Sequence, residues 1–126
     1  MISFDTFRME DGVPIYLQIL LFLKRGIAAG TVRDGDELPS RRVLSALLGV
    51  NPNTVQKAYR MLEEEGLMQS HSGAKSYVVL NGKVKERIRS ELLESDAKGV
   101  IHSLRQMGLT KSDAVALIEK YWEVEG

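Results

Sequence analysis

Apolar residues recur at spacings of three and four positions in five stretches of this chain, the pattern of helices with a buried face. The first stretch follows Pro14, which suits the first position of a helix, and stops near Gly30. Its apolar surface is wider than a single stripe. The second stretch follows Ser40, a capping side chain, and ends at Gly49, which favours a left-handed helix end. We therefore expect two helices over these stretches.

The third stretch begins almost at once after the second. Asn51 is a good N-cap and Pro52 a good first helical residue, so the predicted third helix starts directly after a tight turn. It carries apolar residues at helical spacing up to Glu65-Gly66. Two helices joined by so short a turn form a helix-turn-helix unit.

Two short runs of strand-forming residues follow, at 67–70 and 76–80. The residues between them, His71-Ser72-Gly73-Ala74-Lys75, are typical of a turn, so the two runs predict a β-hairpin. Three helices followed by a hairpin is the order of a winged helix-turn-helix.

From Asn81 onward the pattern is helical again. A long helix is predicted over Gly82 to Met107, with Gly99 as its weak point, and Thr110 can cap a last helix. The fold class predicted from the sequence is mainly α with a small β-hairpin. A winged helix-turn-helix domain is expected over residues 1–80 and a two-helix C-terminal region over residues 81–126.

The C-terminal helices and the first helix carry more apolar surface than one small chain is expected to bury. A symmetric dimer would cover this surface and place two recognition helices one helical turn or more apart on a palindromic site. The residues expected at the dimer interface are Val84, Ile88, Leu92, Ile101, Leu104, Leu117, Ile118, Tyr121 and Trp122.

Composition narrows the function classes. The absence of cysteine excludes a disulfide scaffold, a zinc site with cysteine ligands and a thiol nucleophile. The 17 basic and 17 acidic residues balance, which argues against a polycation that simply coats nucleic acid. The start of the sequence lacks the pattern of a signal peptide, and the apolar run from Val13 to Leu23 is short for a membrane span. We expect a cytoplasmic protein.

The neutral total conceals a local excess of positive charge. Between Leu38 and Leu62 there are four basic residues and no acidic one. The second helix of such a unit enters the major groove, where its first residues meet base edges and phosphates. The charge pattern alone fits a solvated helix face about equally well. Together with the helix-turn-helix and the hairpin, it favours DNA binding.

One motif in this region is highly specific: Asn-Pro-Asn-Thr-Val at 51–55, with Ala-Tyr at 58–59. It is flanked by Leu-Pro-Ser-Arg-Arg-Val-Leu at 38–44 and by Leu-Glu-Glu-Glu-Gly-Leu at 62–67. With Val-Pro-Ile-Tyr-Leu-Gln-Ile at 13–19, these segments resemble the DNA-binding domain of the GntR family of bacterial transcription regulators. The resemblance covers about residues 10 to 80.

The short tail is similar to the YtrA-like subgroup, whose short C-terminal helices are associated with dimer formation. It leaves no room for the large effector domains of other subgroups or for a pyridoxal-phosphate-binding extension. The resemblance implies a homodimeric repressor that binds a palindromic DNA operator and is released by an unknown small-molecule effector. The groove between the C-terminal helices and the DNA-binding domain is the expected place for that effector. No cofactor is expected.

Residue chemistry and the resemblance together give the expected DNA contacts: Ser40, Arg41, Arg42, Asn51, Asn53, Thr54, Gln56, Lys57, Tyr59, Gly73 and Lys75. The turn departs from the family pattern, because His71 and Ser72 stand where arginines are usual and Lys75 where a second glycine is usual. Strong contacts between this turn and the minor groove are therefore not implied.

Two alternatives to these assignments remain open, one for a single residue and one for the whole domain. Tyr59 is expected either to touch a phosphate or to be a core aromatic. The whole domain could instead be a protein-interaction module that uses the winged-helix surface without binding DNA. We do not expect an enzyme, because the sequence shows no nucleophile with a matching base, and His71 and His102 have no acidic partners at metal-ligand spacing.

Overall fold

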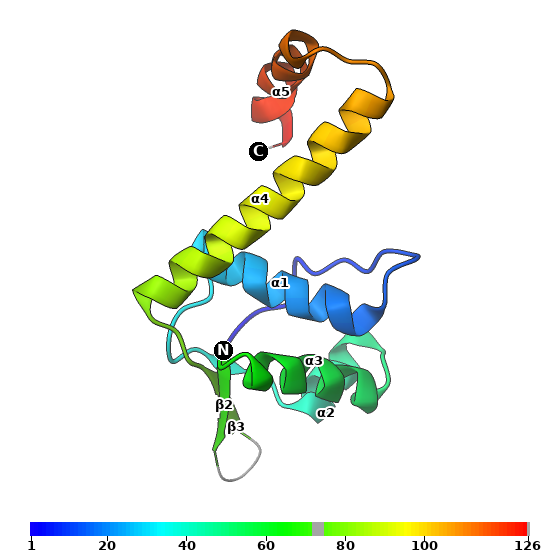
Figure 1. Cartoon of the computed structure of the whole chain (residues 1–126). Helices are drawn as coiled ribbons and strands as arrows, with labels where there is room; N and C mark the ends of the chain where they lie inside the picture. Colours follow the sequence, from blue (N-terminus) through cyan, green and yellow to red (C-terminus); the bar gives the residue numbers. More distant parts are fainter. Residues whose placement is uncertain (72–74, 126) are drawn as a thin grey trace. The chain divides into compact units, whose positions relative to one another are not determined.

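The structure, a computed structural model, describes residues 1–71 and 75–125. The chain forms two compact units, Met1–Ser90 and Glu91–Gly126, which we call the winged unit and the C-terminal unit. The winged unit contains the helices α1 (Ile15–Ala29), α2 (Arg41–Leu48) and α3 (Pro52–Glu64), followed by a β-hairpin (Figure 1). The prediction of a mainly helical winged helix-turn-helix fold is confirmed.

The helix ends lie where the capping residues predict them. The hydroxyl oxygen of Ser40 accepts a hydrogen bond from the backbone N–H of Val43 at 3.1 Å and caps α2. The side-chain oxygen of Asn51 accepts one from the backbone N–H of Asn53 at 2.8 Å and caps α3. These short polar side chains satisfy N–H groups that a helix start leaves without an internal partner.

The sheet has one strand more than the predicted hairpin. The strands β1 (Glu37–Leu38), β2 (Met68–His71) and β3 (Lys75–Val78) are antiparallel in the order β1-β3-β2. In the register, Leu38 lies opposite Ser76, and Met68 lies opposite Val78. The two residues of β1 are too few to show a strand periodicity, which is why the sequence pattern did not reveal it.

The core of the winged unit lies between the three helices and the sheet. The three helices and β1 each supply fully buried side chains to this core, whereas β2 and β3 supply none. Those of the helices include Ile19 and Leu23 of α1, Leu44 of α2, and Val55 and Tyr59 of α3. Gly26 makes a close approach possible, because a Cβ at this position would lie 2.5 Å from Cγ2 of Val32. The segment that follows α1 therefore folds back against the helix at a place where a side chain on residue 26 would collide with it.

The N-terminal segment covers part of α1. The rings of Phe4 and Phe7 are buried, and their centroids lie 5.0 and 5.4 Å from that of Phe22. All the large apolar side chains of α1 are buried or half-buried within the single chain. The aromatic cluster therefore covers Phe22. Leu17 and Leu21, which also widen the apolar surface of α1, are half-buried, so the expectation that α1 contributes surface to a dimer stays a prediction.

Two helices complete the chain. Helix α4 (Gly82–Gln106) begins in the winged unit and continues into the C-terminal unit, and α5 (Lys111–Glu125) follows. Helix α4 is unbroken at Gly99, the predicted weak point. The hydroxyl of Thr110 accepts a hydrogen bond from the backbone N–H of Asp113 at 3.2 Å, so this residue caps α5 as expected.

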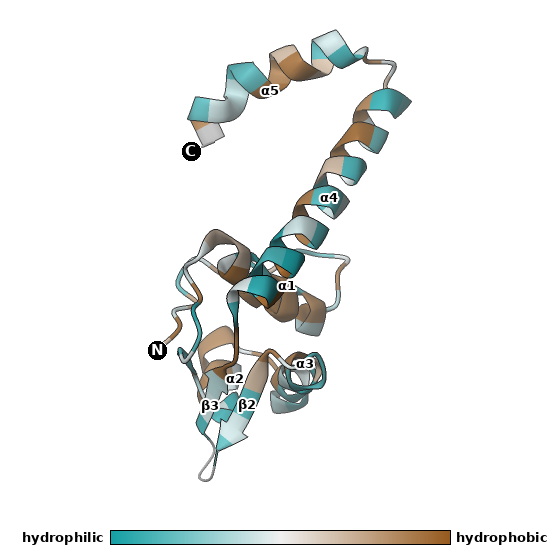
Figure 2. Cartoon of the chain, turned by 60° about the vertical axis from the view of Figure 1, so that its left-hand side comes forward, coloured by the Kyte–Doolittle hydropathy of each residue, from teal (hydrophilic) through white to brown (hydrophobic). Residues whose placement is uncertain are grey.

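The C-terminal unit has no core of its own in a single chain. From residue 91 to residue 124, every side chain is exposed or half-buried. Figure 2 shows hydrophobic positions along the second half of α4 and along α5. Among the described residues, no helix is both long enough and apolar enough to cross a membrane.

Candidate nucleic-acid interface

The turn between α2 and α3 is fixed by three features. Gly49 ends α2 with a φ of 68°, a conformation that glycine adopts without strain. The hydroxyl of Ser45 donates a hydrogen bond to the carbonyl oxygen of Val50 at 2.6 Å, and the N–H of Val50 donates to the carbonyl of Ser45 at 3.1 Å. Ser45 thus closes a ring of hydrogen bonds that sets the angle at which α3 leaves α2.

The first turn of α3 presents polar side chains to solvent. Asn53 and Gln56 are exposed, and Thr54 is half-buried. Asn51 is exposed too, although its side-chain oxygen is engaged in the cap. The amide groups of Asn53 and Gln56 carry both donors and acceptors, which is the chemistry that reads base edges in the major groove. The structure therefore brings together the predicted recognition residues at one end of one helix.

Three cations of α2 and α3 have no carboxylate partner among the described residues. Arg42 and Lys57 are exposed and Arg41 is half-buried. Within residues 1–71 and 75–125, none of the three forms an ion pair. Their charge is therefore available to a phosphate.

The acidic residues at the end of α3 make their contacts with other residues than Arg41, Arg42 and Lys57. Glu65 pairs with Lys24 at 2.7 Å, Glu64 pairs with Arg60 at 3.8 Å, and a carboxylate oxygen of Glu63 accepts a hydrogen bond from the hydroxyl of Ser70 at 3.1 Å. Of the four basic residues between Leu38 and Leu62, Arg60 pairs with Glu64. Three of the four therefore remain without an acidic partner among the described residues.

Tyr59 belongs to the core, the second of the two alternatives that the sequence left open. Its side chain is fully buried, and its hydroxyl donates a hydrogen bond to the carbonyl oxygen of Pro39 at 2.7 Å. Burial raises the pKa of the Tyr59 hydroxyl well above its ordinary value, and the neighbouring Arg41 opposes part of that rise. A phosphate cannot reach this side chain, so the expected direct contact with DNA is corrected.

Two tyrosine rings support the cations of this surface. The guanidinium carbon of Arg41 lies 5.6 Å from the ring centroid of Tyr59, and the ammonium of Lys57 lies 4.0 Å from that of Tyr16 in α1. Both distances are within the range of a cation–π interaction. Sequence reasoning missed Tyr16, because nothing in a helical pattern shows which residue of another helix will lie under Lys57.

The hairpin contributes one exposed cation among its described residues. Lys75 is exposed and lies opposite His71 in the strand register. The ring of His71 is 5.2 Å from that of Tyr77 in an edge-on arrangement. Gly73, expected at the tip of the turn, lies outside the described residues.

The predicted dimer residues differ in their exposure. Trp122 is 71% exposed, and Ile101, Leu117, Ile118 and Tyr121 are also exposed. Half-buried side chains are those of Val84, Leu92 and Leu104. Ile88 is only 4% exposed, because it packs within the winged unit of its own chain. The structure therefore does not support Ile88 as part of a dimer surface.

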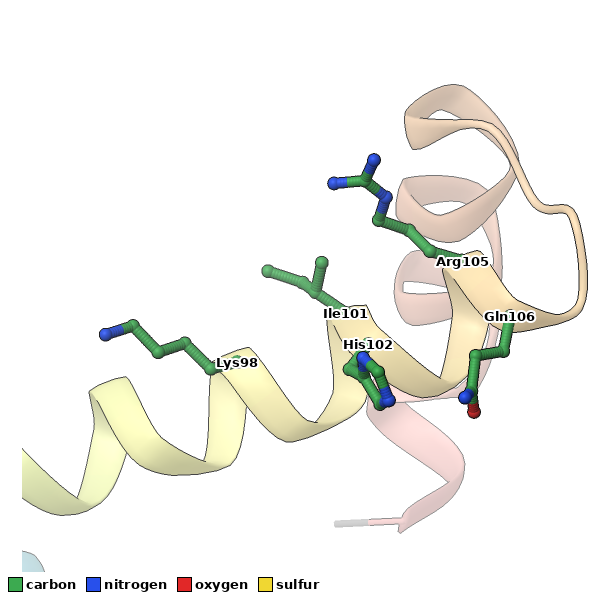
Figure 3. Close-up of a pocket in the computed structure, with 5 residues that line it drawn as sticks. All are labelled: Lys98, Ile101, His102, Arg105 and Gln106. Carbon is green, nitrogen blue, oxygen red and sulfur yellow. The ribbon is translucent and has the colours of Figure 1, made fainter.

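A shallow hollow of about 410 Å³ lies along the second half of α4 (Figure 3). Lys98, Ile101, His102, Arg105 and Gln106 line it. Lys98 also pairs with Glu94 at 3.0 Å. Across the described residues, no group of three or more histidine, aspartate or glutamate side chains is arranged to hold a metal ion.

Comparison with known proteins identifies relatives over most of the chain. Residues 15–78 match the sequence model of the bacterial regulatory proteins of the gntR family. The chain is 35% identical over 101 residues to the HTH-type transcriptional repressor YtrA of Bacillus subtilis, an alignment that covers 72% of this chain and 78% of that protein.

Two solved structures extend the comparison. A GntR family transcriptional regulator from Listeria monocytogenes superimposes with a TM-score of 0.78 at 30% identity, over 89% of this chain and 98% of that one. AraR(DBD) in complex with operator ORX1 is similar with a TM-score of 0.50 at 26% identity, over 57% of this chain and 87% of that one. The first similarity extends over most of the chain, and the second over little more than half of it.

Proposed function

The chain belongs to the gntR family of bacterial regulatory proteins and is a DNA-binding transcriptional regulator, and on that premise we propose that it is a homodimeric repressor that binds a palindromic operator. It acts without a cofactor in the bacterial cytoplasm, and a small-molecule effector releases it from DNA. Residues 1–80 form its DNA-binding domain, and residues 81–126 form its dimerisation region.

One observation carries the DNA-binding assignment to particular residues. The amides of Asn53 and Gln56 are exposed at the start of α3, and the cations Arg41, Arg42 and Lys57 of α2 and α3 form no ion pair in the described part of the chain. Cations fix a protein on phosphates without reading sequence, and amide side chains read bases. A surface that combines both suits sequence-specific binding to duplex DNA. The structure of AraR(DBD) in complex with operator ORX1 supports the binding of duplex DNA by this fold.

Selection of bound sites from random duplex DNA tests this assignment. The expected result is an enriched sequence with two symmetric halves, because a twofold dimer presents the same α3 helix twice. Affinity for the selected site should fall steeply as salt concentration rises, since bound phosphates release counterions. The absence of an enriched sequence, with no salt-sensitive binding, would favour a protein-interaction module instead.

Dimerisation is supported by the exposed apolar side chains of the C-terminal unit. Helix α5 has 15 residues, a length at which an isolated helix is marginal in water, and no side chain from residue 91 to residue 124 is buried. A second copy would cover Ile101, Leu117, Ile118 and Trp122 and would supply the missing core. Sedimentation equilibrium at micromolar concentration tests this directly. A dimer is expected, and a purely monomeric protein would overturn the assignment.

The effector portion of the proposal departs from the groove expected from the resemblance and rests instead on the hollow on α4. Lys98, His102 and Arg105 give this hollow ammonium, imidazole and guanidinium groups, so an anionic effector suits it best. Screening small carboxylates and phosphates by thermal shift, with Arg105→Ala as the control variant, tests this assignment. A ligand that stabilises both proteins equally would place the effector elsewhere.

A further inference from the structure

Arg41 and Tyr59 form an isolated pair at the edge of the DNA-binding surface. The Arg41 guanidinium lies 5.6 Å from the Tyr59 ring centroid, and its Nε is buried without a hydrogen-bond partner. Buried polar atoms in proteins are nearly always hydrogen-bonded, so a donor without a partner needs an explanation. Within the described part of the chain, Arg41 makes no ion pair either. Its main contact is with the ring.

The ring itself is held firmly in place. Tyr59 is fully buried, and the 2.7 Å hydrogen bond from its hydroxyl to the Pro39 carbonyl joins α3 to the segment that precedes α2. Ser40 and Arg41 follow Pro39 directly. The hydroxyl end of the ring is therefore fixed to Pro39, two residues before Arg41. The face of the ring lies under the Arg41 guanidinium.

We propose that Tyr59 is a positioning residue for DNA binding, which holds the Arg41 guanidinium over its ring so that the arginine meets a backbone phosphate at the start of α2. The proposal rests on the proposed DNA-binding function. It gives the buried tyrosine of the recognition helix a part in binding, although the tyrosine never touches DNA.

The physical reason is the entropy of a long side chain. A free arginine loses rotamer freedom when it binds a phosphate, and each immobilised side chain of this kind lowers affinity. A guanidinium that an aromatic ring already holds in place loses less of this freedom when it meets a phosphate. Arg42, which is exposed and has no such support, is the natural comparison within the same helix turn.

A double-mutant cycle on the full-length protein tests the proposal. Affinity for a selected operator is measured for Arg41→Ala, Tyr59→Leu and the double variant. Arg41→Ala should weaken binding about tenfold and make the salt dependence shallower by about 0.9 logarithmic units per decade, the value for one lost phosphate contact. Tyr59→Leu should also weaken binding, but in the Arg41→Ala background it should change the affinity less than twofold.

The matched control is the same cycle with Arg42→Ala. Because Arg42 does not contact the ring, the effects of Tyr59→Leu and Arg42→Ala should add in full. A general loosening of the fold by Tyr59→Leu would weaken binding equally in both arginine backgrounds. That result would overturn the proposal and leave the DNA-binding function intact. Failure of the unmodified protein to bind any selected DNA would overturn both.

A second series covers the case in which Tyr59→Leu does not fold. Phenylalanine at position 59 keeps the aromatic ring in the core, and increasingly fluorinated phenylalanines progressively remove the negative electrostatic potential of the ring face. DNA affinity should fall stepwise with fluorination when Arg41 is present and stay level in Arg41→Ala. An equal response in the two backgrounds would contradict the positioning role.

Discussion

The winged unit and the C-terminal unit are built from similar helices but differ in what a single chain buries. The winged unit has a packed core in which Ile19, Leu44, Val55 and Tyr59 are fully buried. In the C-terminal unit no described side chain is buried, and Trp122 is 71% exposed. A segment of this size without a core does not hold a fold alone. A single chain therefore supplies a packed core for the winged unit, whereas the C-terminal unit would take its core from the second copy of the proposed dimer.

The two units also differ in the kinds of side chain that they expose. The winged unit exposes amides and cations at the start of α2 and α3, whereas the C-terminal unit exposes apolar side chains along α4 and α5. A polar, positively charged surface suits DNA, and an unpartnered apolar surface suits another protein surface. Variants that separate folding, dimer formation and DNA binding should therefore act on one unit at a time.

The largest expected effect is on the core of the winged unit. Leu44→Ala should lower the free energy of unfolding by about 2–5 kcal/mol, because it leaves a cavity among closely packed side chains. Leu47→Ala is the control on the same helix, since Leu47 is 62% exposed and its loss should change stability by about 0.5 kcal/mol or less. Urea unfolding followed by circular dichroism measures both. Equal effects would show that the core is not where the structure places it.

A charge in the C-terminal unit should break the dimer while the winged unit stays folded. Trp122→Glu places a carboxylate on the apolar surface of α5, and we expect the dimer dissociation constant to rise at least 100-fold, or about 2.7 kcal/mol. Ser112→Glu adds the same charge at an exposed polar position and should leave the dimer unchanged. Sedimentation velocity reads out both. A dimer that survives Trp122→Glu would place the interface on another surface.

Loss of one cation should weaken DNA binding without affecting either fold or dimer. Arg42→Ala should cost about 1–2 kcal/mol of binding free energy at moderate salt, because Arg42 is exposed and unpaired. Arg60→Ala removes an equal charge that already pairs with Glu64 at 3.8 Å, so its effect should be smaller. Fluorescence anisotropy with the selected operator measures the two affinities. A larger loss for Arg60→Ala would reverse our assignment of the surface.

The smallest effect concerns alkaline pH. Since burial raises the pKa of Tyr59 in the folded state, the unfolded chain releases this proton at a lower pH than the folded one does. The resulting stability is complete below pH ~10 and is lost as pH rises above it. Between pH 10 and 11 the free energy of unfolding should fall by about 1 kcal/mol more in the unmodified protein than in Tyr59→Phe. Identical pH profiles would show that Tyr59 titrates normally.

Capping residues and apolar spacing were sufficient to predict most of the fold. Ser40, Asn51 and Thr110 each cap the helix expected of them, because capping depends on a side chain and the backbone a few residues away. Strand β1 and the Phe4–Phe7–Phe22 cluster could not be predicted, since both depend on contacts between distant segments.

The candidate site shows the same limit. The sequence indicated Arg41, Arg42, Asn53 and Gln56 as surface residues, because a cap, a turn and a charge pattern define the outer face of a helix-turn-helix. It left Tyr59 undecided between surface and core, and it gave no sign that Arg41 lies over its ring. The contact between Arg41 of α2 and Tyr59 of α3 depends on the angle at which the two helices pack, which apolar spacing does not specify.

The central claim is that the winged unit contacts DNA and the C-terminal unit joins two copies to do so. Sedimentation equilibrium of the full-length protein with a labelled duplex of the selected operator measures how many chains bind each site. We predict that two chains of the unmodified protein bind each duplex together. After Trp122→Glu, each half-site should bind a single chain independently and with lower affinity. One chain per intact operator in the unmodified protein, bound with the affinity of the Trp122→Glu variant, would contradict the account.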